Sequence, residues 1–98
     1  MNRITKEQVI ERVKKDGRDL RKVFKEFRND KDVVITAVKE NNIAFHWASD
    51  ELKNDEEFIK ECVKKYGFLY VTLPKDLQDD QSIREIVINN EYYKDYIN

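Results

Sequence analysis

The 98-residue chain is poor in the residues that break or crosslink a polypeptide. It has two glycines, one proline and one cysteine. A lone cysteine excludes a disulfide within the chain. The scarcity of glycine and proline, and the lack of any low-complexity run, argue against a flexible linker or a disordered tail. We therefore expect a single domain over residues 1–98.

Long apolar runs are also missing. No stretch approaches the roughly 20 apolar residues that a membrane helix requires. Residues 1–9 lack the apolar run of a signal peptide. Together with the single cysteine, Cys62, these features predict a cytoplasmic protein that does not enter a membrane.

The motifs that mark catalytic and cofactor sites are absent as well. The sequence has no glycine-rich phosphate loop and no calcium-loop spacing. Its only histidine, His46, has no cysteine or histidine nearby in sequence to share a metal. No orienting motif accompanies Cys62 that would make it a nucleophile. Paired acids such as Glu56 and Glu57 fall at expected helix starts, where they complement the helix dipole. We predict a non-enzymatic protein with no cofactor and no metal.

What the sequence does contain is a pattern that recurs every 25 residues. Five columns are apolar in each of the first three copies. They are Val9/Val34/Ile59, Val13/Val38/Val63, Leu20/Phe45/Tyr70, Val23/Ala48/Leu73 and Phe27/Leu52/Leu77. Two further columns hold Gly17/Asn42/Gly67 and Asp30/Asp55/Asp80. A period of this length is typical of stacked supersecondary repeats.

Each column has a structural interpretation. Two apolar residues four positions apart lie on one face of a helix. The glycine or asparagine column that follows favours a left-handed turn. Apolar residues spaced three and four apart then indicate a second helix. The aspartate that closes the unit is expected to cap the following helix. The second helices are expected over 18–28 and 43–53. Although Phe68–Val71 is β-prone, the repeat register predicts a helix there too.

A two-helix unit cannot bury its apolar face alone, so neighbouring units must stack. The sequence therefore predicts an all-α fold, a short stack of helix-turn-helix repeats. It has three units and a partial fourth that caps the C-terminal end. The predicted units are about residues 5–29, 30–54, 55–79 and 80–98.

The second unit resembles a known family. Residues 32–55 are similar to a short bacterial and protist repeat, the domain of unknown function 4116 family. The matching positions are Val33, Val34, Ala37, Val38, Asn41, Ala44, Phe45, Ala48, Ser49, Leu52 and Asp55. Asn42 replaces the usual glycine, and the third unit has Cys62 and Pro74 where alanine and serine are expected. The resemblance implies an all-helical fold and carries no activity.

The expected helix over residues 18–28 is strongly polarised. At 100° per residue, Leu20, Val23, Phe24 and Phe27 gather on one side. The other side is basic and consists of Arg18, Arg21, Lys22, Lys25 and Arg28. Residues 1–31 carry a net charge of +5 and residues 32–98 carry −6, which gives the chain total of −1.

This basic stripe has three interpretations. It is a solvated helix face, or an anion-binding surface for nucleic acid or an acidic protein, or a membrane-surface contact. The membrane interpretation is weakest, because the apolar side of the helix is needed for the core. The total charge of −1 counts against nucleic-acid binding.

Four aromatic residues are candidate partner contacts. Trp47 follows a buried line of residues and is either a packing residue or an exposed anchor. Tyr92, Tyr93 and Tyr96 either cap the stack or form an adhesive patch. Because the sequence contains no catalytic or cofactor motif, the repeat favours a protein-interaction module, an adaptor or inhibitor. Its partner is expected to be another protein. The alternative is nucleic-acid or polyanion binding through the basic stripe.

Overall fold

The computed structural model describes residues 3–91 and 93–94, and every regular element within them is a helix. The predicted all-α fold class is therefore confirmed. The chain divides into two compact units, residues 1–55 and 56–98. Whether these units form the single domain expected from the sequence stays a prediction. Two of the candidate contacts, Tyr92 and Tyr96, lie outside the described residues.

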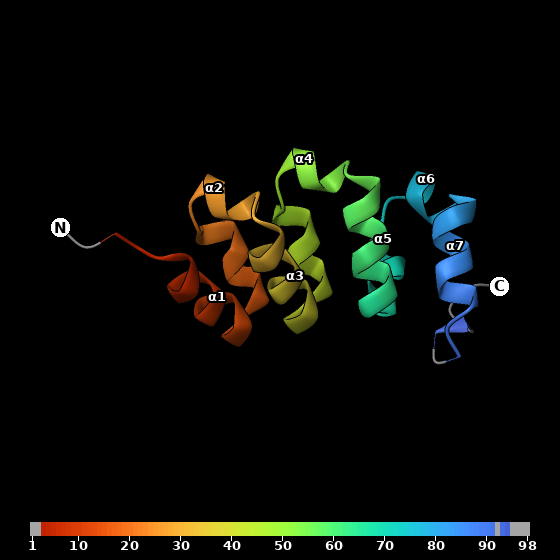
Figure 1. Cartoon of the computed structure of the whole chain (residues 1–98), viewed down its shortest axis with the longest axis horizontal. Helices are drawn as coiled ribbons and strands as arrows, with labels where there is room; N and C mark the ends of the chain where they lie inside the picture. The colour runs from red at the N-terminus through yellow and green to blue at the C-terminus, as the bar shows by residue number, and fades with distance from the viewer. Residues whose placement is uncertain (1–2, 92, 95–98) are drawn as a thin grey trace. The chain divides into compact units, whose positions relative to one another are not determined.

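The first unit contains two repeats of the same three elements (Figure 1). Each repeat has a ten-residue α-helix, a six-residue 3₁₀ helix (η) and a four-residue α-helix. The elements are α1 (Lys6–Lys15), η1 (Gly17–Lys22), α2 (Lys25–Arg28), α3 (Lys31–Glu40), η2 (Asn42–Trp47) and α4 (Asp50–Lys53). α1 packs against α3, and η1 packs against η2.

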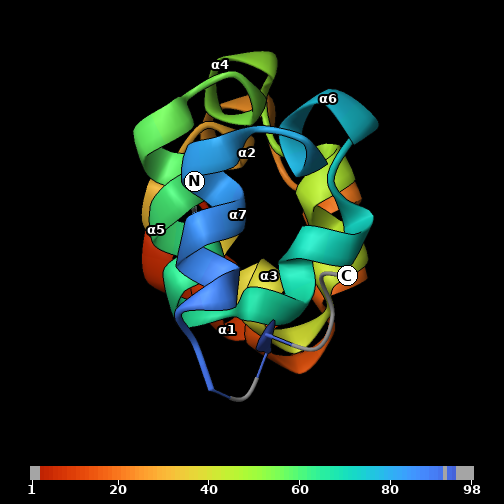
Figure 2. The same ribbon diagram turned by 90° about the vertical axis from the view of Figure 1, so that its right-hand side faces the viewer.

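The second unit follows the same order. It contains α5 (Glu56–Lys65), η3 (Gly67–Thr72), α6 (Lys75–Gln78) and α7 (Gln81–Ile88). Helices α5 and α7 pack side by side (Figures 1 and 2). The long helices of the two units begin 25 residues apart, at Lys6, Lys31, Glu56 and Gln81.

Side-chain caps set where the long helices begin. Thr5 and Gln8 form a capping box, with Gln8 N–H donating to Thr5 Oγ1 at 3.2 Å and Thr5 N–H donating to Gln8 Oε1 at 2.9 Å. Asp30 and Asp80 each accept two backbone N–H groups of the helix that follows. Hydrogen bonding by Ser82 is the main cause of the lowered pKa of Asp80.

The continuous helices predicted over 18–28 and 43–53 are wrong. Two extended residues separate each 3₁₀ helix from the short α-helix, at Val23–Phe24, Ala48–Ser49 and Leu73–Pro74. A 3₁₀ helix has three residues per turn, so a spacing of three suffices to align the buried side chains Leu20 and Val23. The break turns Phe24 outward, where it is 61 % exposed instead of buried as predicted.

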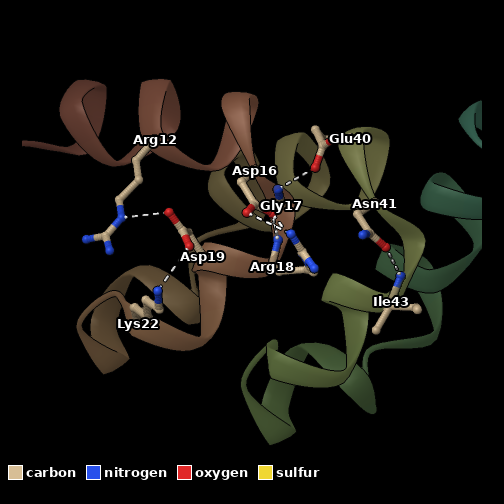
Figure 3. Close-up of polar contacts among 9 residues, drawn as sticks. All are labelled: Arg12, Asp16, Gly17, Arg18, Asp19, Lys22, Glu40, Asn41 and Ile43. Carbon is tan, nitrogen blue, oxygen red and sulfur yellow. Dashed lines mark hydrogen bonds and ion pairs between the residues drawn. The ribbon is translucent and has the colours of Figure 1, made fainter.

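The predicted left-handed turns are also wrong. No described residue, glycine included, has a positive φ angle. The chain turns instead at extended residues: Asp16 accepts the Arg18 N–H, and Asn41 accepts the Ile43 N–H (Figure 3). These short side-chain caps start the 3₁₀ helices in the two repeats of the first unit.

Gly17 is required for close approach between repeats. An added Cβ atom would lie 2.3 Å from the carbonyl oxygen of Ala37 and 3.2 Å from the Asn41 nitrogen. The bare Gly17 N–H donates to Glu40 Oε1 at 2.6 Å (Figure 3). Gly67 instead leaves room for the ring of Tyr93, which lies over it. Tyr93 therefore covers part of η3, and its role as a cap or as an adhesive patch stays a prediction.

The first long helix buries fewer residues than the second, as expected for the outer and inner helices of a stack. α1 buries Val9 and Val13, whereas α3 buries Val33, Val34, Ala37 and Val38. The positions of α1 that correspond to Val33 and Ala37 are the exposed residues Gln8 and Arg12. The outer face of α1 is thus polar, and its inner face packs on α3.

The β-prone run Phe68–Val71 lies in the 3₁₀ helix η3, so the helical prediction from the repeat register is confirmed. Leu69 and Tyr70 are buried, and Tyr70 donates its hydroxyl to the Gln78 carbonyl at 2.6 Å. Repeat packing thus outweighs the local preference for a strand.

Replacing Gly17 with alanine should lower the free energy of unfolding by about 1–3 kcal/mol, because the new methyl group meets rigid backbone. Gly67→Ala is the matched control. It should lower the free energy of unfolding by less, because the Tyr93 side chain can rotate away from the new methyl group. Urea unfolding followed by circular dichroism measures both. A Gly17→Ala variant as stable as the wild type would contradict the close approach.

Candidate functional site

A groove of about 690 Å³ lies in the first unit beside Trp47. One wall comes from α2 and the other from the end of η2 and from α4. Helices α2 and α4 lie above α1 and α3 in Figure 1. The lining residues are Lys25, Glu26, Arg28, Asn29, His46, Trp47, Ala48, Ser49, Asp50, Glu51 and Lys53. We call this the Trp47 groove.

Hydrogen bonds between the repeats hold the two walls together. The Ser49 N–H donates to the Arg28 carbonyl at 2.8 Å. The Ser49 hydroxyl donates to the Asn29 side chain, which in turn donates to Glu51 Oε2 at 3.2 Å. Ser49 Oγ also caps α4 by accepting the Leu52 N–H at 3.1 Å. The base of the groove is therefore fixed by several mutually supporting bonds.

Trp47 is half-buried at the end of η2. The Arg21 guanidinium carbon lies 6.0 Å from the centroid of its ring, at the outer limit of a cation–π contact. Because Trp47 lines the groove, part of its ring is available to a ligand while the rest packs on the protein. Its half-buried state lies between the two possibilities that the sequence left open, and a role as a partner contact stays a prediction.

Some charges in the Trp47 groove are already satisfied. Lys53 Nζ lies 3.6 Å from Asp50 Oδ1 and donates to the His46 carbonyl at 3.2 Å. Glu51 accepts a hydrogen bond from the neutral Asn29 side chain, which leaves its charge in place. Four charged lining residues, Lys25, Glu26, Arg28 and Glu51, form no ion pair within the described part of the chain.

Arg28 is the most constrained of these residues. Its Nε atom is buried and donates to no acceptor among residues 3–91 and 93–94. A buried donor left without a partner costs about 1–3 kcal/mol. The two terminal nitrogens of the Arg28 guanidinium also carry N–H groups. These N–H groups lie in one plane, so a carboxylate can accept two parallel hydrogen bonds from them.

The five residues of the predicted basic stripe do not form one surface. Arg18 is held by Asp16 at 3.1 Å, and this hydrogen bond is the main cause of the lowered pKa of Asp16 (Figure 3). Lys22 Nζ lies 3.7 Å from Asp19, whose carboxylate also pairs with Arg12. These two cations belong to local pairs beside α1.

Of the other three members of the stripe, Lys25 and Arg28 line the Trp47 groove, and Arg21 lies over the Trp47 ring. The break at Val23–Phe24 separates Lys25 and Arg28 on α2 from Arg18, Arg21 and Lys22 on η1. The structure thus brings Trp47 together with three of the five basic candidates. Tyr93 belongs to the second unit, where it lies over Gly67.

Sequence reasoning missed the second wall of the groove. His46 was considered only as a metal ligand, and Asp50, Glu51 and Lys53 were not singled out, although the 25-residue register aligns Lys53 with Arg28. That alignment was the available signal. A smaller hollow of about 480 Å³, lined by Arg3, Ile4, Phe24, Glu26 and Phe27, was missed because Phe24 was assigned to the core.

Comparison with known families agrees with this architecture. A family model described as Domain of unknown function (DUF4116) matches residues 5–53 and, in a second overlapping match, residues 36–78. The chain belongs to the DUF4116 family. No curated protein and no solved structure matches it. The DUF4116 description assigns no ligand or reaction, so the Trp47 groove is interpreted from its geometry.

Other kinds of site are not seen in the described residues of this DUF4116 chain. No group of three or more His, Cys, Asp or Glu side chains there is arranged to hold a metal ion. None of the described helices is both long and apolar enough to cross a membrane. Cys62 is buried on α5, and burial raises the pKa of its thiol to about 12. A thiol that stays protonated is a poor nucleophile.

Cys62 should therefore react slowly with a disulfide reagent at pH 8 in the native protein and rapidly once the protein is unfolded in urea. Unfolding releases the pKa from about 12 toward its ordinary value of 9.0. As pH rises, the thiol ionises in the unfolded chain before it ionises in the folded protein. The free energy of unfolding should therefore fall as pH rises from about 9 to about 12. Rapid labelling of the native protein would contradict the burial of this thiol.

Proposed function

We propose that this protein is a non-enzymatic interaction module, an adaptor or inhibitor, that binds another protein through the Trp47 groove. The observation that carries the proposal is a half-buried tryptophan in a groove beside three cations, Arg21, Lys25 and Arg28, that lack ion-pair partners in the described chain. A cytoplasmic location is part of the proposal. A single buried cysteine is compatible with a reducing compartment.

The composition of the groove supports a protein ligand. Tryptophan and arginine are the residue types most enriched among binding hot spots, particularly where neighbouring contacts exclude water. The volume of about 690 Å³ is within the range of sites that enclose a few side chains or a small molecule. Trp47 supplies a flat apolar contact, and the surrounding charges supply orientation.

The rigidity of the groove supports the same conclusion. Binding is weakened by the entropy of ordering loops and side chains, and this loss is smaller at a preformed site. The walls are joined by the Ser49–Arg28 backbone bond and by the side-chain bonds of Asn29. A partner would therefore meet a surface that is already in place.

Nucleic-acid or polyanion binding through the stripe stays the alternative prediction. It is less favoured, because Arg18 and Lys22 are paired with Asp16 and Asp19. The stripe is also broken at Val23–Phe24. A mobility shift that disappears in the Arg21→Glu/Lys25→Glu variant would support the alternative.

The proposal predicts that Trp47→Ala abolishes partner capture. Tagged wild-type protein, Trp47→Ala and the matched control Phe24→Ala are used as baits in lysate from the cell of origin, with crosslinking and quantitative mass spectrometry. Phe24 is 61 % exposed and lies outside the Trp47 groove. We expect a protein recovered with wild type and Phe24→Ala and reduced about 30-fold or more with Trp47→Ala.

Circular dichroism of all three baits controls for folding. Identical recovery with wild type and a folded Trp47→Ala variant would contradict a role for the groove. Recovery of nothing above background with any bait would contradict the interaction function itself.

A further inference from the structure

We infer that the segment bound in the Trp47 groove is an acidic peptide that places a bulky apolar side chain against Trp47. This inference rests on the proposed function and specifies the chemistry of the partner. It follows from how the charges around the groove are distributed between internal pairs and unpaired groups.

The unpaired charges beside Trp47 carry a positive balance. Within the described residues, Arg21, Lys25 and Arg28 have no carboxylate partner, and the carboxylates of Glu26 and Glu51 have no cation partner. Asp50 pairs with Lys53, whereas the hydrogen bond from the neutral Asn29 amide leaves the charge of Glu51 in place. A ligand therefore meets three unpaired cations and two unpaired carboxylates, and acidic residues placed beside the cations complement them.

Arg28 gives the acidic preference a geometric basis. Arg28 lines the groove, its Nε is buried without an acceptor in the described chain, and no described carboxylate pairs with its terminal nitrogens. A carboxylate can accept two parallel N–H bonds from one guanidinium, and such charge-assisted bonds are stronger than neutral ones. A neutral segment would leave this capacity unused.

Trp47 and Ala48 give the groove an apolar part next to these cations. The indole face accepts an aliphatic or aromatic side chain, and Arg21 lies 6.0 Å from its centroid. Covering Trp47 would also shield Arg21 from water and so strengthen its attraction to a carboxylate. The apolar and acidic parts of the ligand thus reinforce one another.

The acids that line the groove argue for a protein rather than a phosphate backbone. Glu26, Asp50 and Glu51 lie among the cations. A nucleic acid presents negative charge at every nucleotide and would bring phosphates against these carboxylates. A peptide can place its acidic residues beside Arg21, Lys25 and Arg28 only, and neutral residues elsewhere.

The test uses random peptides displayed on phage, selected on the full chain at low salt. Phage that also bind the Trp47→Ala variant are removed in each round. Selected peptides are then synthesised and titrated against the protein while Trp47 fluorescence is recorded. Trp47 is the only tryptophan of the chain, so the signal reports directly on the groove.

We expect the selected peptides to combine Asp or Glu with a bulky apolar residue. Lys25→Glu should weaken their binding about tenfold or more, because it replaces an attraction with a repulsion. The matched control Lys39→Glu makes the same charge change on an exposed residue of α3 outside the groove and should have little effect. The affinity should also fall as salt is raised.

Other outcomes overturn either the acidic chemistry of the ligand or the groove as an interaction site. Selected peptides that lack acidic residues, or equal effects of Lys25→Glu and Lys39→Glu, would overturn the acidic chemistry and leave the interaction function standing. Failure to enrich any peptide that depends on Trp47 would overturn the groove as an interaction site. Short oligonucleotides serve as the probe for the alternative, and binding that is stronger than that of any peptide would favour a polyanion.

Discussion

The first unit depends on close backbone contact between its two repeats. Gly17 carries no side chain, so the turn after α1 approaches the Ala37 carbonyl at the end of α3. Its N–H is then within 2.6 Å of the Glu40 carboxylate. A larger residue would force α1 and α3 apart and expose Val9, Val13, Val33 and Ala37, which are at most 3 % exposed. Apolar burial of this kind is the main stabilising term for short helices.

The Trp47 groove is a consequence of the same contact. When the first turn of one repeat fits against the long helix of the next, α2 is brought to η2 and α4. The Arg28 carbonyl then receives the Ser49 N–H, and Asn29 reaches Glu51. The two walls thus come from different repeats, and each helix that contributes to them has only four to six residues. The groove arises without any long loop.

The sequence predicted the long helices and their caps because apolar spacing and capping chemistry are local. Asp30 and Asp80 cap the helices that follow them, as expected. It did not predict the breaks at Val23–Phe24 and Ala48–Ser49, because the spacing of three between Leu20 and Val23 and between Phe45 and Ala48 fits a 3₁₀ helix as well as an α-helix. The role of Gly17 was also misassigned, because close approach depends on residues of another repeat. The sequence also could not distinguish the three cations near Trp47 from Arg18 and Lys22, because Trp47 belongs to the next repeat.

The central claim is that successive repeats of the first unit pack with the turn at Gly17 against the end of α3. The most direct measurement is a nuclear Overhauser spectrum of isotope-labelled protein. The account predicts cross-peaks between the Gly17 α-protons and the Asn41 amide proton, which lie in neighbouring repeats. Absence of these cross-peaks in a folded, fully assigned protein would contradict it.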